Sequence, residues 1–405
     1  MRKAVPLATK LPSFATAADS VAETLEIALT IKRVERLTER IGGERVTERE
    51  AAVAAWEALP LVAKQTAPPG VKAPAKVCVS CDGGRLQRCD LPPEAKSHWC
   101  ETKVGICLEL EAGSHAEDPC PAAPDKFLDL VQMEKVTREI KRSVAKGSPF
   151  ARQDAAAENA ADATAQVAAA REPVVAEPPK VIGREVVASL ASSELFGRQL
   201  AAQAWSLGFA AATAKAFVAD GGSANWGIWQ RHFKHLHYVP ILDFIHALTY
   251  IFSAAMAGWS RDEGAAVYVR WITWVWRGEV VRVIAELAAR AAELGAPEPE
   301  TGETDPRQIL AETLTYLTNQ QSRMNYSKYR RDGLPITSSH IESTVKQINY
   351  RVKGSEKFWS ASGGEALLQL RADVLCDTAP LDRFWSRRAQ QSTGTRTSHR
   401  PRTAA

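Results

Sequence analysis

Two short apolar runs in this chain each end in an aspartate that is followed by two glycines. The runs are KVCVSC and AKAFVA, and the aspartates are Asp82 and Asp220. Runs of this length, bounded by turn-forming residues, are typical of buried strands, and in the second half of the chain they alternate with helical patterns. This alternation favours parallel strand pairing within one mixed sheet, so the sequence predicts an α/β fold. Aspartates at the carboxyl ends of such strands point toward the edge where α/β sheets build their sites.

The composition limits the class of protein. With 405 residues, of which 45% are hydrophobic, the chain can bury a sizeable core. Its net charge of +4 permits a nucleic-acid partner without requiring one. No secretory signal pattern is seen, and the longest apolar stretch, Tyr238 to Gly258, is interrupted by Pro240, Asp243 and His246. With seven irregularly spaced cysteines, these features predict a cytoplasmic protein without membrane association.

Changes in pattern divide the chain into segments. Residues 1–72 form an N-terminal helical module, which could bind DNA, mediate dimer contacts or act as a helical adaptor. Residues 73–118 carry three strands of the core, 119–185 a linker or insertion, and 186–247 the second part of the core. Residues 248–330 are helical, 331–389 complete the core, and 390–405 form a disordered basic tail.

Glycines set two of the predicted boundaries within these segments. Gly42 and Gly43 separate two helices of the N-terminal module. Gly83 and Gly84 form the turn between the first two of three successive antiparallel strands. Two tryptophan-rich helical stretches are predicted over residues 244–292. Their cluster is interpreted as helix core, with stacking on DNA as the alternative, and consists of Trp271, Trp274 and Trp276.

A third acidic residue, Glu342, lies in the segment PITSSHIES. Ser338 or Ser339 can cap a helix that carries Glu342 in its first turn. Magnesium prefers carboxylate oxygens, so two or three converging acids are what a phosphoryl-transfer site needs. Structural interpretations exist for each acid, because Asp-Gly is a common turn pair and a glutamate is favoured at a helix N-terminus.

Several blocks of the sequence carry a resemblance to a known family. They are GLPITSSHIEST, RVKGSEKFWS, GEALLQLRADVL, CDGGRLQ with ETKVG, and FVADGG with ILDFIHA. Together they resemble the DDE transposases of bacterial insertion sequences, in particular the ISKra-type group related to the Mutator superfamily. The resemblance covers the chain from about Val77 to Trp385. It implies an RNase H-like catalytic core with a helical insertion before the last acid, in addition to the N-terminal helical module.

The resemblance also implies an activity. Asp82, Asp220 and Glu342 fall on the catalytic positions, where they would bind Mg²⁺, or Mn²⁺ in its place. The implied reaction is cleavage of double-stranded DNA at the element's ends, followed by strand transfer into a target. Joining two ends implies at least a homodimer on the DNA, and the DNA-bound protein would be associated with the nucleoid. The alternatives are a DNA-binding protein of the same fold without catalysis and an RNase H-like nuclease.

The sequence departs from the family pattern at two places. Related transposases carry a Cys-x-x-His pair after the second aspartate, and here Asp243 and His246 occupy that spacing. Asp243 is therefore a rival to Asp220 as the second catalytic acid. His246 would either orient a metal-bound water or a phosphate, or be structural. In addition, Thr337 and Ser339 stand where many relatives have glycine.

Basic and aromatic residues follow Glu342. Such a surface suits contacts with phosphates and unstacked bases, and a solvated helix face is the alternative. The predicted DNA contacts are Lys346, Arg351, Lys353, Lys357 and Trp359. Elsewhere, Cys78 and Cys81 form a CxxC pair, but residues three apart in a strand face opposite sides, so no zinc site is predicted.

Overall fold

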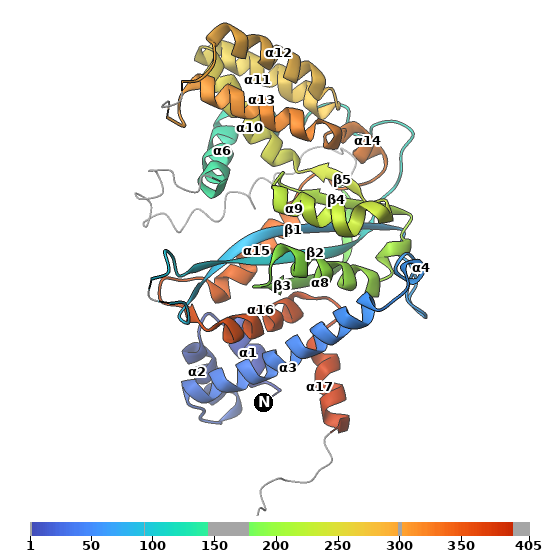
Figure 1. The fold of residues 1–405 in the computed structure, drawn as a ribbon, viewed down its shortest axis with the longest axis vertical. Helices are drawn as coiled ribbons and strands as arrows, with labels where there is room; N and C mark the ends of the chain where they lie inside the picture. The colour runs from blue at the N-terminus through green and yellow to red at the C-terminus, as the bar shows by residue number, and fades with distance from the viewer. Residues whose placement is uncertain (1, 93, 145–177, 299–301, 392–405) are drawn as a thin grey trace, which may run out of the picture.

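A six-stranded mixed sheet forms the centre of the computed structural model (Figure 1). The structure describes residues 2–92, 94–144, 178–298 and 302–391, so residues 145–177 of the predicted linker and most of the predicted tail lie outside the described residues. The strands are β1 (Lys76–Arg88), β2 (Trp99–Glu111), β3 (Lys180–Ser189), β4 (Ala214–Ala219), β5 (Val239–Leu242) and β6 (Phe358–Trp359). Their order is β3-β2-β1-β4-β5, with β6 paired to β1. Pairs β1–β2 and β2–β3 are antiparallel, and β1–β4, β4–β5 and β1–β6 are parallel. The predicted α/β class is confirmed.

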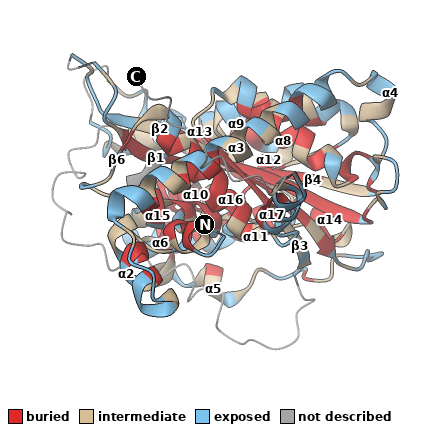
Figure 2. Ribbon diagram, turned by 90° about the horizontal axis from the view of Figure 1, so that it is seen from below, coloured by how far each residue is buried: buried red, intermediate tan, exposed pale blue. Residues whose placement is uncertain are grey.

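Helices cover both faces of this sheet, and the strands are largely buried between them (Figure 2). On one face, α8 (Ser193–Ser206) packs so closely on β2 that a Cβ at Gly105 would lie 2.7 Å from Leu200. On the other face lie α15 (Ser339–Val352) and α16 (Ala361–Leu375). The long helix α3 (Ile31–Glu57) contacts α8 and α16, and so borders the edge strand β3.

The helices between β5 and α15 form the upper part of Figure 1. Between β5 and α15 lie α10 (Phe244–Gly258), α11 (Arg261–Trp276), α12 (Val280–Leu294), α13 (Pro306–Gln320), η6 (Gln321–Arg323) and α14 (Tyr326–Arg331). The others are α1 (Ala4–Lys10), α2 (Phe14–Leu25), α4 (Leu61–Lys64), α5 (Asp125–Leu128), α6 (Leu130–Val144), η3 (Phe209–Ala211), α9 (Ser223–Ile228), η4 (Trp229–Phe233), η5 (Lys234–Leu236) and α17 (Pro380–Gln391). Among the described helices, none is both long and apolar enough to span a bilayer.

The helices between β5 and α15 share one hydrophobic core with the sheet. Residues 244–292 form three helices rather than the two predicted, because a capping box of Ser260 and Glu263 starts α11 and Gly278, at φ +83°, follows its end. Trp271 and Trp276 are buried, as predicted. Consequently, residues predicted as separate segments pack as one unit around the sheet.

The prediction of a helix break at Gly42 and Gly43 is wrong. Helix α3 runs through both residues. A Cβ on Gly42 would lie 2.5 Å from the carbonyl oxygen of Ala366 in α16, whereas a Cβ on Gly43 would meet nothing within 4 Å. The first glycine is therefore explained by the close crossing of two helices.

These adjacent glycines give a matched pair of substitutions. Gly42→Ala is expected to destabilise the protein by about 1–3 kcal/mol, because its methyl group overlaps backbone atoms that must move apart. Gly43→Ala is expected to stabilise it by roughly 0.5–1 kcal/mol through the higher helix propensity of alanine. Urea denaturation of the two variants measures both values, and equal effects would contradict the close crossing.

The predicted turn at Gly83 and Gly84 is also wrong. Strand β1 continues through both glycines to Arg88, and the chain reverses between Arg88 and Trp99. A Cβ on Gly84 would lie 2.7 Å from Thr102 Oγ1 and 2.9 Å from Asn349 Oδ1, so this glycine allows α15 to lie close to the sheet. The third antiparallel strand is β3, which begins inside the range predicted as a linker.

Candidate functional site

The sheet register brings three aspartates to one level on neighbouring strands. Ser80 of β1 pairs with Val218 of β4, so Asp82 and Asp220 each lie two residues farther along. Ala219 of β4 pairs with Leu242 of β5, so Asp220 and Asp243 are the next residues on both. Strands β4 and β5 end at this level. The three acids therefore lie at the carboxyl edge of the parallel strands, where α/β sheets place their sites.

Glu342 comes to this edge from a helix on one face of the sheet. It occupies the first turn of α15, which packs on β1 and β2. Because side chains alternate along a strand, Asp82 lies on the same face of β1 as Gly84, where α15 makes its close approach. In addition to burial and the charge of Asp220, the charge of Glu342 raises the pKa of Asp82, so the two acids lie on the same side of the sheet. Within the described residues, however, Asp82, Asp220 and Glu342 do not form a group whose ligand atoms all lie within 4.8 Å of one another.

Crowding of negative charge perturbs Asp82. Burial, then the charge of Asp220 and, to a smaller extent, the charge of Glu342 raise the pKa of Asp82 from 3.8 to about 6. The Gly83 amide, which donates to Asp82 Oδ1 at 2.6 Å, and the nearby His246 oppose this rise in pKa. A carboxyl group in this state is costly to ionise without a cation beside it.

Asp220 is held in place by the segment that follows it. Its Oδ1 accepts hydrogen bonds from the Gly222 amide at 2.9 Å and from Asn225 Nδ2 at 3.0 Å. The thiol of Cys81 donates to Asn225 Oδ1 at 3.4 Å, which links this aspartate to β1. Both bonds to Asp220 fall on one carboxylate oxygen, so its orientation is fixed by Oδ1 alone.

Helix α13 supports the backbone at Asp220. The Tyr316 hydroxyl donates to the carbonyl of Asp220 at 2.9 Å, and Gln320 donates to the carbonyl of Gly221 at 3.3 Å. Gly221 has φ +100°, and a Cβ there would lie 2.8 Å from the Tyr316 ring. A groove of about 510 Å³ lies beside this contact, lined in part by Gly221, Tyr250 and Asn319.

Asp243 lies in a different environment, since its side chain is fully buried at the N-cap of α10. Its Oδ1 accepts from the Ile245 amide at 3.0 Å, and its Oδ2 accepts from His246 Nδ1 at 2.6 Å and Ser338 Oγ at 2.7 Å. Burial opposes ionisation, but these bonds, above all that from His246, lower the pKa of Asp243 overall. Burial likewise opposes the charge on His246, and Asp243 raises its pKa to about 9. The two form a buried ion pair at neutral pH.

One group of side chains in the described residues has the spacing of a metal site. Ligand atoms of Asp243, His246 and Glu342 all lie within 4.8 Å of one another, so this group could hold a metal ion. The Ile245 amide and His246 already donate to the carboxylate of Asp243, and the one hydroxyl proton of Ser338 is shared between Asp243 and Glu342. Apart from that shared proton, Asp82 accepts from the Gly83 amide alone among the described residues, so Asp82 and Glu342 keep more oxygen lone pairs for a cation.

Comparison with known proteins gives no relative from which a function could be transferred. No protein-family model matches the chain, and a search of curated proteins finds no significant match.

Two of the five predicted DNA contacts are buried, and their prediction as surface residues is wrong. The Arg351 guanidinium donates to the Ala8 carbonyl at 2.8 Å and lies over the rings of Phe14 and Trp359. Burial lowers its pKa to about 10, with a smaller effect from Arg371. Trp359 is also buried, and its indole donates to the Val352 carbonyl at 2.9 Å. Both residues attach the N-terminal helices to α15.

The three predicted lysines lie at the surface. Lys346, one turn after Glu342 on α15, and Lys353, just past its end, are exposed. Lys357 is half-buried and donates to the Tyr350 carbonyl at 3.1 Å. Tyr350 and Phe358 are exposed beside them, so a basic and aromatic surface does follow Glu342.

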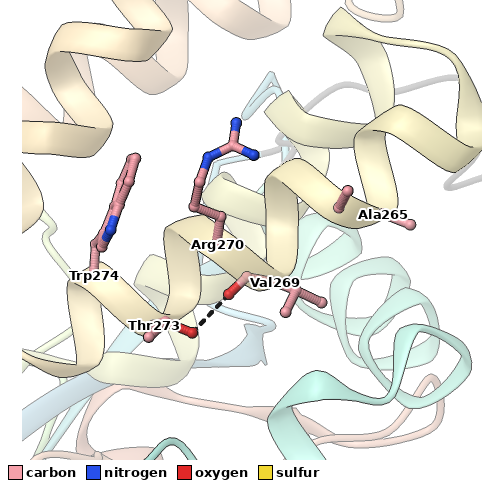
Figure 3. A pocket seen from close by; sticks show the side chains of 6 residues that line it. Ala265, Val269, Arg270, Thr273 and Trp274 are labelled. Carbon is pink, nitrogen blue, oxygen red and sulfur yellow. Dashed lines mark hydrogen bonds between the residues drawn. The ribbon is translucent and has the colours of Figure 1, made fainter.

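A second hollow lies on the outer side of α11 (Figure 3). It measures about 520 Å³ and is lined by Ala265, Ala266, Val269, Arg270, Thr273 and Trp274. Trp274 is half-buried and packs against the hydrophobic core, and the Arg282 guanidinium lies 4.1 Å from its ring centroid. None of the acids discussed above lines this hollow, so it is separate from the candidate site.

Sequence patterns did not reveal Asn225 or Tyr316 as supporting residues. Asn225 follows Asp220 by five positions, and a polar residue near the start of a helix was the only available signal. Tyr316 contacts Asp220 across 96 residues of chain, for which one sequence contains no signal. Ser338 occupies the predicted N-cap position of α15, but its side chain makes no cap bond and instead contacts acids of the site.

Proposed function

We propose that this protein is a DDE-type transposase with an RNase H-like catalytic core. The observation that carries the proposal is the sheet register, which places Asp82 and Asp220 at one level on β1 and β4, with Glu342 in the first turn of the helix that packs on β1. Together with burial, the charges of Asp220 and Glu342 raise the pKa of Asp82. Three antiparallel strands followed by two parallel ones, with a helical insertion before the last acid, support the same assignment. The family resemblance in the sequence agrees with this arrangement.

The residues at the site fit a divalent cation. Asp82, Asp220 and Glu342 offer carboxylate oxygens, which are the ligands that Mg²⁺ and Mn²⁺ prefer. The raised pKa of Asp82 reflects negative charge that a cation would neutralise. When bound, a pair of such ions activates the attacking oxygen and stabilises the leaving oxygen of a phosphodiester. Asn225 and Tyr316 would keep Asp220 in position. Asp243 would support the site through its hydrogen bonds and would not bind the metal, because its carboxylate already accepts from the Ile245 amide and from His246.

The proposed substrate is double-stranded DNA at the ends of the element, cleaved to free a 3′-hydroxyl that then attacks target DNA. Lys346, Lys353 and Lys357 would contact phosphates near Glu342, because their surface follows that acid along α15. Synapsis of two ends would require at least a homodimer on the DNA. The proposed place of action is the bacterial cytoplasm, on the nucleoid.

The test is a cleavage and joining assay with Mg²⁺. The substrate is a plasmid that carries the gene for this chain with several hundred flanking base pairs on each side, and an unrelated plasmid serves as target. Glu342→Gln is expected to lower both cleavage and joining by at least about 10³-fold, because a residue that holds a metal ion in place is lost. Glu23→Gln, which changes an exposed glutamate of α2 away from the proposed DNA contacts, is the control and should keep full activity.

Each other outcome assigns a different function. Cleavage without joined product would indicate a nuclease of the same fold. Salt-dependent DNA binding without cleavage would indicate a binding protein that lacks catalysis. Full activity of Glu342→Gln would contradict the assignment of the third acid.

A further inference from the structure

Ser338 links two acids that come from different parts of the chain. Its hydroxyl lies 2.7 Å from Asp243 Oδ2 and 3.0 Å from Glu342 Oε1. The side chain is buried, and the backbone around it is tied to the start of α10, because the Phe244 amide donates to the Ile336 carbonyl at 2.9 Å. Ser338 therefore lies between the carboxylate of Asp243 and that of Glu342 in the first turn of α15.

The carboxylate of Asp243 is held firmly in place. Asp243 accepts from the Ile245 amide and from His246 independently of Ser338, and no part of its side chain is exposed. A carboxylate held by these two donors in a buried setting has little freedom to turn. Through Ser338, this fixed carboxylate restricts the position of the Glu342 side chain, which is itself only partly buried.

The Ser338 hydroxyl does not cap helix α15. An N-cap serine usually accepts a hydrogen bond from a backbone amide of the first turn, and Ser338 makes no such bond. The Glu342 and Ile341 amides bond instead to the Ser338 carbonyl, at 3.1 and 3.0 Å. The side chain is therefore committed to the two carboxylates.

We propose that Ser338 is a positioning residue that holds the Glu342 carboxylate in its metal-binding orientation, with Asp243 and His246 as the fixed base of the network. This inference rests on the proposed function, because it takes Glu342 as a metal ligand. A serine has one hydroxyl proton, so it can donate to only one of the two carboxylates at a time. In the proposed role that proton is donated to Glu342 Oε1, while the Ile245 amide and His246 hold Asp243. Ser338 need not touch the metal or the DNA.

The test measures Mn²⁺ binding to the full chain without DNA, by titration followed through the electron paramagnetic resonance signal of free Mn²⁺. Ser338→Ala is expected to weaken Mn²⁺ binding by about 10-fold or more, as is typical when a partner that orients a metal ligand is removed. Ser339→Ala, which changes the exposed neighbouring serine, is the matched control and should bind as the wild type does. Ser338→Thr, which restores a hydroxyl, should recover most of the affinity.

The melting temperature of each metal-free variant separates positioning from folding. Weaker Mn²⁺ binding in Ser338→Ala, with restoration in Ser338→Thr at a similar melting temperature, supports the proposal. Equal Mn²⁺ binding by Ser338→Ala and the wild type overturns it and leaves the proposed function standing. If the wild type binds no Mn²⁺, both fail. If the expected changes in Mn²⁺ binding occur but no DNA is cleaved, the positioning role stands and the transposase assignment does not.

Discussion

Asp82→Asn is expected to make the metal-free protein more stable at neutral pH while it abolishes magnesium-dependent cleavage. The pKa of Asp82 is raised from 3.8 to about 6 by burial and by the charge of Asp220. A raised pKa in the folded state means that folding favours the protonated form, so the contribution of this group to stability falls as pH rises from about 4 to 6. At pH 7 the ionised carboxylate costs on the order of 1–3 kcal/mol, which a neutral asparagine of the same shape does not incur.

Urea denaturation at pH 4.5 and pH 7.5 measures this effect. The variant should gain over the wild type at the higher pH and lose most of that gain at the lower one. Cleavage should fall by at least about 10³-fold, because the metal loses a charged ligand. Asp262→Asn, at an exposed position in the first turn of α11, controls for removal of a negative charge. A variant that is less stable than the wild type at pH 7.5 would refute the crowding of charge around Asp82.

Asp220→Asn and Asp243→Asn are expected to fail in different ways. The Asp220 variant keeps an oxygen that accepts from Gly222 and Asn225, so it should fold normally and lose cleavage. The Asp243 variant places an amide among buried donors and removes the charge that pairs with His246. Breaking a buried pair in this way typically costs about 3–5 kcal/mol of unfolding free energy.

The pH dependence adds a second measurement for Asp243. Because the pKa of His246 is raised from 6.5 to about 9, its share of the stability is complete below pH 6.5 and is lost as pH rises to 9. Denaturation curves at pH 6 and pH 9.5 should therefore show a smaller gap between the wild type and Asp243→Asn at the higher pH. An Asp243 variant that is as stable as the wild type but inactive would make Asp243, rather than Asp220, the second catalytic acid.

The acids of the site were predictable because their local signals are strong. Asp82 and Asp220 follow apolar runs of strand length, and the register of parallel strands then brings them to one level. Glu342 was indicated mainly by the resemblance to transposases and by its place in a first helical turn. The distinction between Asp220 and Asp243 required the structure, since burial and its hydrogen-bond donors set Asp243 apart and its sequence does not show them.

The errors share a physical cause. A glycine pair signals a turn or a break in a sequence, yet at Gly42 and Gly84 it marks a place where two elements touch. A basic residue on a helix is typically solvated, yet Arg351 is buried between aromatic rings and a backbone carbonyl. The packing of Gly42, Gly84 and Arg351 depends on residues far away in the chain. Local sequence patterns therefore could not distinguish a glycine in a turn from one at a close contact, or an exposed arginine from a buried one.

The contact between α13 and the backbone of Asp220 has a consequence for how this protein can change over evolution. Tyr316 fills the space that a side chain at residue 221 would need, and Gly221 accommodates the ring with a backbone conformation that few other residues adopt. Helix α13 and the loop after Asp220 are thus complementary surfaces that cannot vary independently. A helical segment grafted from another protein in place of α13 would have to bring its own match for residue 221, or it would displace Asp220.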